Sequence, residues 1–238
     1  MENLKCCIDR TTRPAHEDGL AVMHAWGLSE GWLNQNEVIV YCHGAGFDDR
    51  HKLEWLDVFA EVEEFTNLKF AETKDWNAAL LRIEYRNAGS WSFVGNDNYH
   101  IDKANPTTNI GWLGRGTKRH ELGHFIGLGH EHQTPKVPIN WNKEYVYNYM
   151  AGAPNFWSKP QTDWNFFRVY DQSQTVGTVR DPDSIMMYAI PKEFTLDGFF
   201  TTENENWSEL DKEFLSGVYP KAKEVEGVEL DTLSLIHI

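Results

Sequence analysis

Apolar residues between positions 49 and 65 recur at the three- and four-residue spacing of an amphipathic helix. Acidic residues fill the positions between them, and Asp48 or Asp49 suits the N-cap. The spacing predicts one helix over 49–65 that packs through its apolar face. The apolar positions of this pattern are Leu53, Leu56, Phe59, Ala60 and Val62.

Three shorter runs have the character of β-strands. Glu37 to Cys42 is rich in β-branched residues, and the segments Asn67 to Thr73 and Ala79 to Tyr85 are similar candidates. A helix and strands on one side of a second helix form the layer pattern of an α/β (α+β) fold.

Regular periodicity is lost after residue 130, where four prolines interrupt the chain before residue 161. A short helix still fits 142–150. Ser208 suits the N-cap of a final helix over 209–218, which Pro220 would end.

Residues 120–130 are His-Glu-Leu-Gly-His-Phe-Ile-Gly-Leu-Gly-His. His120 and His124 are four residues apart, so a helix directs both imidazoles to one point. A glycine after this pair permits a turn that would bring His130 in as a third nitrogen ligand. Glu121 is placed to hold the attacking water rather than the metal. Three protein ligands leave a fourth position open, as a catalytic zinc ion requires.

A second pattern lies downstream at residues 184–188, which are Ser-Ile-Met-Met-Tyr. A thioether beneath the metal gives an apolar floor for the imidazoles. Met186 is preferred to Met187 for this floor because Tyr188 then lies two residues after the methionine. The phenol of Tyr188 would act as an extra ligand or as a hydrogen-bond donor to an oxyanion. The same residues also fit ordinary core positions after a turn.

These two patterns resemble the astacin family of metzincin zinc endopeptidases, and the resemblance extends over about residues 36–220. It implies a polypeptide substrate and one catalytic zinc ion. It also implies that Glu131 matches the family acid near the mature N-terminus. The site residues that it implies are His120, His124 and His130 as ligands, Glu121 as general base, Met186 as the turn methionine and Tyr188 as a switchable fifth ligand.

The resemblance further implies a metzincin fold, with a twisted mixed sheet and the zinc helix in an upper lobe of about 36–130. An irregular lower lobe of about 131–220 would end in the final helix. Residues 1–35 would be a lead-in or pro-segment, and 221–238 a tail. The family's edge strand above the cleft falls within 95–109, where the polar residues fit a surface loop equally well.

The chain has 238 residues and a formal net charge of −14, which argues against nucleic acid or an anionic membrane as partner. Its apolar runs are too short to span a bilayer. We expect a monomer. The first residues lack the apolar core of a secretory signal, whereas the resemblance favours a secreted protein.

Three cysteines, at positions 6, 7 and 42, cannot build the paired disulfide frame of animal astacins. A thiolate from Cys6 or Cys7, or the carboxylate of Asp9, would occupy the fourth metal position until the N-terminal segment is removed. The alternatives are two thiols without a role, or one bonded to Cys42.

Lys192 follows the methionine turn and would favour an acidic substrate side chain, unless it is simply solvated. Two other functions fit the same residues: a silent member that binds peptides without cleaving them, and a zinc hydrolase of a non-peptide bond. A closed structural site with His132 as fourth ligand is disfavoured, since such sites usually contain cysteine.

Overall fold

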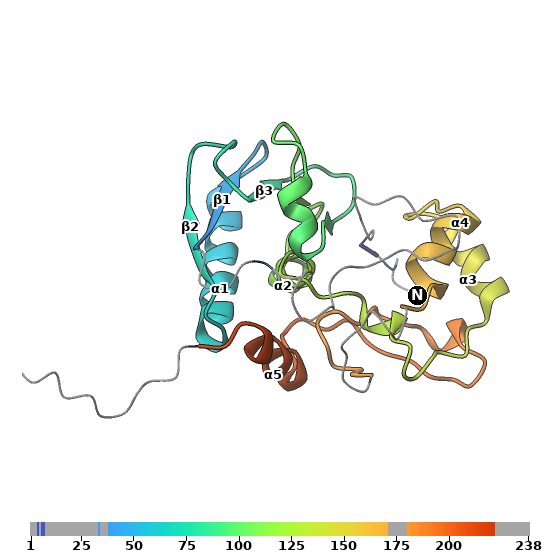
Figure 1. Ribbon diagram of the computed structural model, residues 1–238. Helices are drawn as coiled ribbons and strands as arrows, with labels where there is room; N and C mark the ends of the chain where they lie inside the picture. The colour runs from blue at the N-terminus through green and yellow to red at the C-terminus, as the bar shows by residue number, and fades with distance from the viewer. Residues whose placement is uncertain (1–3, 5, 8–32, 34–37, 171–179, 222–238) are drawn as a thin grey trace, which may run out of the picture.

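The computed structural model describes residues 4, 6–7, 33, 38–170 and 180–221. Within these residues a five-stranded sheet with α1 and α2 lies toward one end of the molecule, and α3 and α4 lie at the other (Figure 1). The elements in chain order are β1 (Val38–His43), α1 (Asp49–Phe65), β2 (Lys69–Glu72), β3 (Leu81–Glu84), β4 (Trp91–Ser92), η1 (Gly95–His100), β5 (Thr108–Asn109), α2 (Arg115–Phe125), η2 (Glu131–Gln133), α3 (Lys143–Met150), α4 (Lys159–Thr162), η3 (Asp163–Phe167), η4 (Lys192–Phe194) and α5 (Glu209–Val218).

The sheet has the strand order β2-β1-β3-β5-β4. β1 pairs in parallel with β2 and β3, β3 pairs in parallel with β5, and β4 is antiparallel to β5. The three strands predicted from composition are present, with ends that differ by a residue or two. The sheet is therefore mixed, as expected.

Helix α1 has the predicted bounds, but only Phe59 and Val62 of its predicted apolar face are buried, and Ala60 is exposed. Asp48 caps its first turn by accepting a hydrogen bond from the His51 N–H at 2.8 Å. Leu53 and Leu56, expected on the apolar face, are 63% and 44% exposed. The large indole of Trp55 enters the core instead and sets the rotation of the helix. The buried stripe consists of Trp55, Val58, Phe59 and Val62.

Helix α2 is attached to α1 by two charge pairs, of which the first is buried and the second partly buried. The ammonium of Lys118 is fully buried and lies 2.5 Å from the carboxylate of Glu54 on α1. The guanidinium of Arg119 lies 2.6 Å from Glu61 on the same helix. Because a buried charge needs its partner in good geometry, these pairs restrict how α2 can lie on α1.

The edge strand lies just before the segment in which the family places it. β4 pairs Trp91 with Asn109, and the chain then leaves the sheet at Gly95, whose φ is 52°. The amide of Asn98 donates to the carbonyls of Phe93 and Gly95, which stabilises the 3-10 turn η1. Residues 95–109 are thus mainly a turn and loop that return to the sheet as β5.

The chain after residue 138 folds around a second apolar cluster, and its helices carry clear N-caps. The side chain of Asn142 caps α3, and Ser158 with Gln161 forms a capping box at α4. The short helix predicted within 142–150 is confirmed. The fully or largely buried members of this second cluster are Cys6, Cys7, Ile139, Val146, Met150, Trp157, Phe166, Met187, Tyr188, Ile190 and Phe194.

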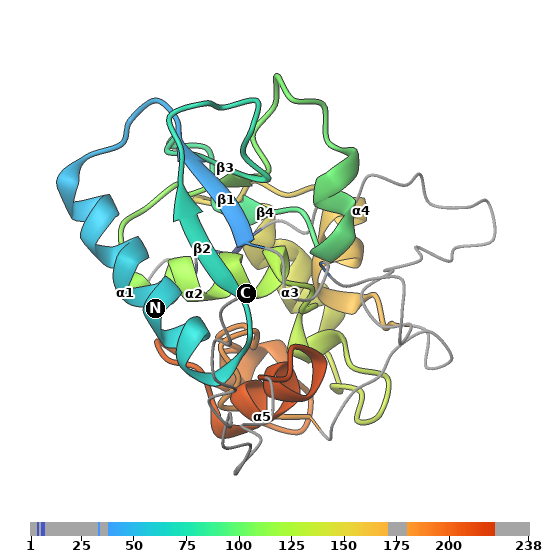
Figure 2. The same cartoon turned by 60° about the vertical axis from the view of Figure 1, so that its left-hand side comes forward.

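Helix α5 has the predicted bounds and lies at the bottom of the molecule in Figures 1 and 2. It packs against α1, and Leu215 belongs to the core cluster formed by the sheet, α1 and α2. The hydroxyl of Tyr219 donates to the Ile126 carbonyl at 2.8 Å and accepts from the Leu33 N–H at 3.2 Å. No helix in the described part of the chain is long and apolar enough to cross a membrane.

Candidate metal centre

Three imidazoles from residues 120–130 converge on one point. Helix α2 carries His120 and His124 on one face, and the chain reverses after it at Gly127, whose φ is 111°. This turn places the Nε2 atom of His130 3.3 Å from that of His120 and 3.1 Å from that of His124. The glycine turn thus does what the sequence pattern predicts.

Backbone carbonyls fix the tautomers of two of these histidines. Nδ1 of His120 donates to the Ile185 carbonyl at 2.7 Å, and Nδ1 of His124 donates to the Leu128 carbonyl at 2.8 Å. Burial lowers the pKa of His120 to about 3 and that of His130 well below its ordinary value. Neutral rings therefore direct Nε2 lone pairs at each other, which suits a cation between them.

The thiol of Cys7 completes a four-donor set. Its Sγ lies 3.1 Å from Nε2 of His120, 3.6 Å from that of His124 and 2.9 Å from that of His130. All four donor atoms lie within 4.8 Å of one another. Zinc–nitrogen bonds of about 2.0 Å in a tetrahedron place nitrogens about 3.3 Å apart, so this set fits a zinc ion.

Met186 lies beneath the helix that carries the first two histidines. A Cβ on Gly123 would come 2.4 Å from the Met186 sulfur, so the absence of a side chain there lets the thioether reach the helix. The Glu131 N–H donates to the Met186 carbonyl at 3.0 Å and holds the two segments together. Met187 belongs to the second cluster and lines the cavity beside the imidazoles, whereas it is Met186 that contacts the helix.

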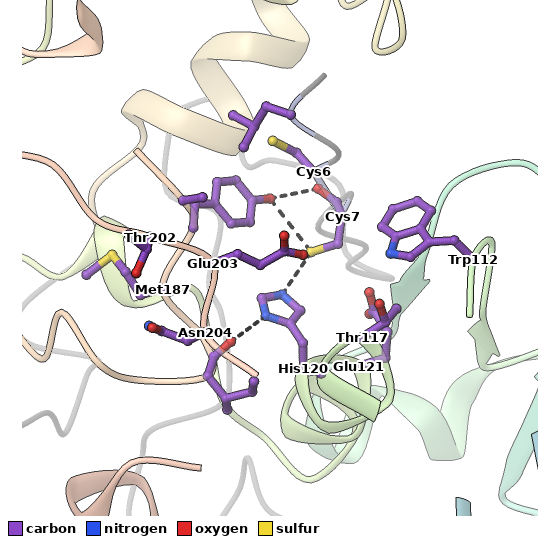
Figure 3. Close-up of a pocket in the computed structure, with 15 residues that line it drawn as sticks. Cys6, Cys7, Trp112, Thr117, His120, Glu121, Met187, Thr202, Glu203 and Asn204 are labelled. Atoms are coloured by element: carbon purple, nitrogen blue, oxygen red, sulfur yellow. Dashed lines mark hydrogen bonds between the residues drawn. The ribbon is translucent and has the colours of Figure 1, made fainter. Parts of the chain in front are cut away.

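Tyr188 and Glu121 border the same centre. The hydroxyl of Tyr188 donates to the Cys7 carbonyl at 2.7 Å, and its ring centroid lies 4.4 Å from that of His130. Glu121 is 1% exposed and, with His120, lines a cavity beside the imidazoles. Figure 3 shows Glu121 and His120 on the helix below Cys7.

Residues 26–213 match the family model described as Astacin, a peptidase family. The chain belongs to the astacin family. The match covers most of the sequence and confirms the resemblance that residues 120–130 and 184–188 indicate.

Similar proteins support the same assignment. A structure of myroilysin is 32% identical and aligns over 81% of this astacin-family chain and 97% of its own, with a TM-score of 0.76. High choriolytic enzyme 1, a hatching enzyme zinc-protease from Oryzias latipes, is 16% identical with a TM-score of 0.55 and shows the fold alone. Tolloid-like protein 2 from Mus musculus is 26% identical over 64% of this chain, which spans only 14% of that protein.

A cavity of about 650 Å³ opens beside the metal centre of this astacin-family protein. One side is formed by α2 through Thr117, His120 and Glu121, and the other by residues 202–204. Figure 3 shows the Glu203 side chain extending toward Cys7 and His120. Nothing in the sequence pattern singled out 202–204, because they share no spacing with a known motif.

Asp211 is a further residue that motif analysis missed. Its carboxylate accepts hydrogen bonds from the Ser184 hydroxyl at 2.7 Å, the Ile185 N–H at 2.9 Å and the Ser208 N–H at 3.0 Å. Since Ile185 holds the ring of His120, Asp211 links helix α5 to a candidate metal ligand. Its sequence signals were its place three residues after Ser208, in a capping box, and the resemblance of residues 208–211 to astacin-like proteases, neither of which indicates a contact with the metal centre.

The remaining candidates lie at different distances from the centre. Cys6 is buried in the second cluster and outside the four-donor group, and Cys6, Cys7 and Cys42 are all free thiols. Asp9 lies outside the described residues. The ammonium of Lys192 lies 4.6 Å from the Phe200 ring centroid, and Lys192 does not line the cavity.

His132 does not join the donor group. Its Nε2 atom donates to the Asn165 carbonyl at 2.8 Å, and its ring stacks on Tyr188 with centroids 4.3 Å apart. It therefore supports the position of the tyrosine ring rather than a closed zinc site.

Proposed function

We propose that the chain is a zinc-dependent endopeptidase that cleaves internal peptide bonds of polypeptides. The proposal rests on the three imidazoles of His120, His124 and His130, whose Nε2 atoms converge in a chain of the astacin family, with that of His130 3.3 Å and 3.1 Å from the other two. When bound, zinc lowers the pKa of its water toward neutrality and polarises a carbonyl. His120, His124 and His130 would hold it.

Glu121 is proposed as the general base. It lies beside His120 at the cavity, where it would take a proton from the attacking water and deliver it to the leaving amine. Tyr188 is proposed to donate a hydrogen bond from its hydroxyl to the oxygen that gains negative charge. Its hydroxyl already donates to a peptide carbonyl, that of Cys7.

Glu121→Gln tests this assignment. The amide matches the carboxylate in size but is not basic, so the variant should retain zinc and fold while casein cleavage falls by a factor of about 100 or more. Zinc content and thermal melting supply the controls. Unchanged turnover would remove Glu121 as base.

The same casein assay, run with and without a chelator, separates the alternative functions. A silent peptide-binding member would bind the substrate and cleave nothing in either condition. A hydrolase of another bond would cleave an ester and leave casein intact, while remaining sensitive to the chelator. Chelator-sensitive casein cleavage is the result that the proposal requires.

We further propose that Cys7 keeps the full chain latent by occupying the fourth metal position. Its sulfur lies with the three Nε2 atoms, whereas Cys6 packs into apolar surroundings. The segment is also held at Leu4, whose N–H donates to the Tyr149 hydroxyl at 3.2 Å and whose carbonyl accepts from Asn155 at 2.9 Å. These contacts support the proposal that the residues around Cys7 are held against the candidate metal site.

Cys7→Ser tests the latch in the full chain, with Cys42→Ser as the matched control. The Cys7 variant should cleave casein faster than the parent protein, and the control should not. In cobalt-loaded protein, the sulfur-to-metal charge-transfer absorption should disappear only in the Cys7 variant. If this absorption is absent from the parent protein, the thiolate is not a ligand.

A further inference from the structure

The cavity beside the candidate metal centre contains the proposed general base, and the N-terminal residues Leu4, Cys6 and Cys7 also line it. His120 and Glu121 form one side of it, and the segment 202–204 forms the other. A substrate side chain that entered between them, with its peptide bond at Glu121, would contact residues 202–204. The chemistry of this segment therefore bears on substrate choice.

The charged side chains that line this cavity, apart from the imidazole, are all acidic. They are Glu121 and Glu203, and no Lys or Arg is present among the described residues of the lining. Glu121 is assigned to catalysis. Glu203 is exposed to the cavity and has no hydrogen bond or ion pair with any residue that the structure describes. A fixed carboxylate in a concave site attracts cations and repels anions.

The backbone around Glu203 is held on both sides. Thr201 and Ile190 form an antiparallel bridge with two hydrogen bonds of 3.1 Å. The amide of Asn204 donates to the carbonyls of Pro182 at 2.9 Å and Ser184 at 2.8 Å. Because the neighbours on either side are fixed, the carboxylate is presented from a rigid segment, which favours selective binding.

Three other residues of the lining suit a long cationic side chain. The cavity volume of about 650 Å³ is ample for lysine or arginine with bound water. Trp112 offers an aromatic surface to the methylene stem or to the cation itself. The hydroxyls of Thr117 and Thr202 provide acceptors for N–H groups.

We propose that Glu203 makes this cavity a binding site for a lysine or arginine side chain of the substrate, adjacent to the cleaved bond. This inference rests on the proposed endopeptidase function. It is the opposite of the acidic preference that Lys192 favours, and Lys192 is outside the lining.

The test compares two peptides that differ at one position beside the cleaved bond, one with Lys and one with Met of similar length. The zinc-loaded full chain carries Cys7→Ser throughout, so that the thiol does not hold the metal. We expect kcat/KM to be about tenfold higher for the Lys peptide, and the ratio to fall at high salt. Glu203→Gln should bring the ratio of kcat/KM for the Lys and Met peptides down to about one.

Glu193→Gln is the matched control, because Glu193 is also exposed but does not line the cavity. It should retain the full preference. Equal kcat/KM for the two peptides, or the same ratio in the Glu203 and Glu193 variants, would overturn the proposal.

A binding measurement separates this inference from the proposed function. In the Glu121→Gln protein no turnover is needed, and the Lys peptide should bind about tenfold more tightly than the Met peptide only when Glu203 is present. If this holds while no variant cleaves any peptide, the endopeptidase proposal fails and the site at Glu203 stands. Equal affinity, or binding of neither peptide, overturns the site.

Discussion

The position of the candidate metal ligands depends on a glycine without a side chain as well as on residues that form hydrogen bonds. Gly123 lies on α2 between His120 and His124, and the Met186 sulfur occupies the space where its side chain would be. Ile185, the residue before Met186, fixes the imidazole of His120 through a hydrogen bond to its carbonyl. The geometry of the imidazoles thus depends on the chain segment beneath them.

Gly123→Ala should therefore weaken the centre. The new Cβ would lie 2.4 Å from the Met186 sulfur, so the methionine must shift, and we expect a loss of about 1–3 kcal/mol in the free energy of unfolding. Zinc affinity should fall with it. Urea denaturation and zinc titration measure the two effects.

Gly217→Ala is the control for the change in helix propensity. A Cβ at Gly217, also in a helix, meets nothing within 4 Å, so this variant should be neutral or slightly more stable. Similar results for the two glycines would mean that contact with Met186 is not important.

At the scale of elements, helix α5 supports the metal centre from a distance in the sequence. Asp211 in its first turn accepts three hydrogen bonds, two of them from Ser184 and Ile185 before Met186. The helix also packs on α1, so one short helix joins the sheet layer to the segment that holds His120.

Asp211→Ala should lower both stability and zinc affinity. It leaves buried donors of Ser184 and Ile185 without an acceptor, which costs about 2–4 kcal/mol in the free energy of unfolding. Glu213→Ala, an exposed change on the same helix, should have little effect. Zinc binding that is unaltered in the Asp211 variant would show that α5 does not position His120.

The starts of helices α1 and α5 could be predicted from the sequence because a single capping residue determines each of them. Asp48 and Ser208 cap α1 and α5 at the predicted positions, because a side-chain acceptor at a helix start is a local property. Leu53 and Leu56 were assigned to the wrong face, since several helix rotations bury apolar residues and only packing partners choose among them. The contribution of Asp211 comes from contacts between distant segments, which no local pattern contains.

On the scale of the whole molecule, the metal centre lies where the two apolar clusters meet. Met186 belongs to the cluster of the sheet, α1 and α2, and its neighbour Met187 belongs to the cluster that contains Cys7 and Tyr188. Residues 120–130 indicated the candidate ligands because all three lie in one short stretch. Glu203, on the opposite side of the cavity, comes close to His120 and Glu121 only in the complete fold.

Stability of the whole molecule should decrease in mild acid through His43. Partial burial lowers the pKa of His43 to about 4 from 6.5, with Glu72 opposing and Lys52, His51 and Lys118 assisting. Above pH 6.5 the ring is neutral in the folded and unfolded chains alike. Between pH 6.5 and 4 only the unfolded chain gains the proton, so the free energy of unfolding falls as the pH falls.

His43→Gln should remove this contribution while keeping an acceptor for the Tyr85 hydroxyl, which lies 2.7 Å from Nδ1 of His43. We expect the parent protein to lose roughly 1–2 kcal/mol more than the variant between about pH 7 and about pH 4.5, allowing for partial exposure of the ring. Urea denaturation of chelator-treated protein at both pH values measures it. Parallel losses would assign the effect to other groups.

The contact between Leu33 and Tyr219 has a consequence for the proposed latency. In the intact chain, Leu33 is fixed in the core, and Cys7 is therefore tethered at a high effective concentration near the imidazoles. A single cut between the two residues removes this tether, although every contact made by Cys7 is still available. The released piece would then rebind as a separate molecule, so dilution alone would decide how much enzyme is open.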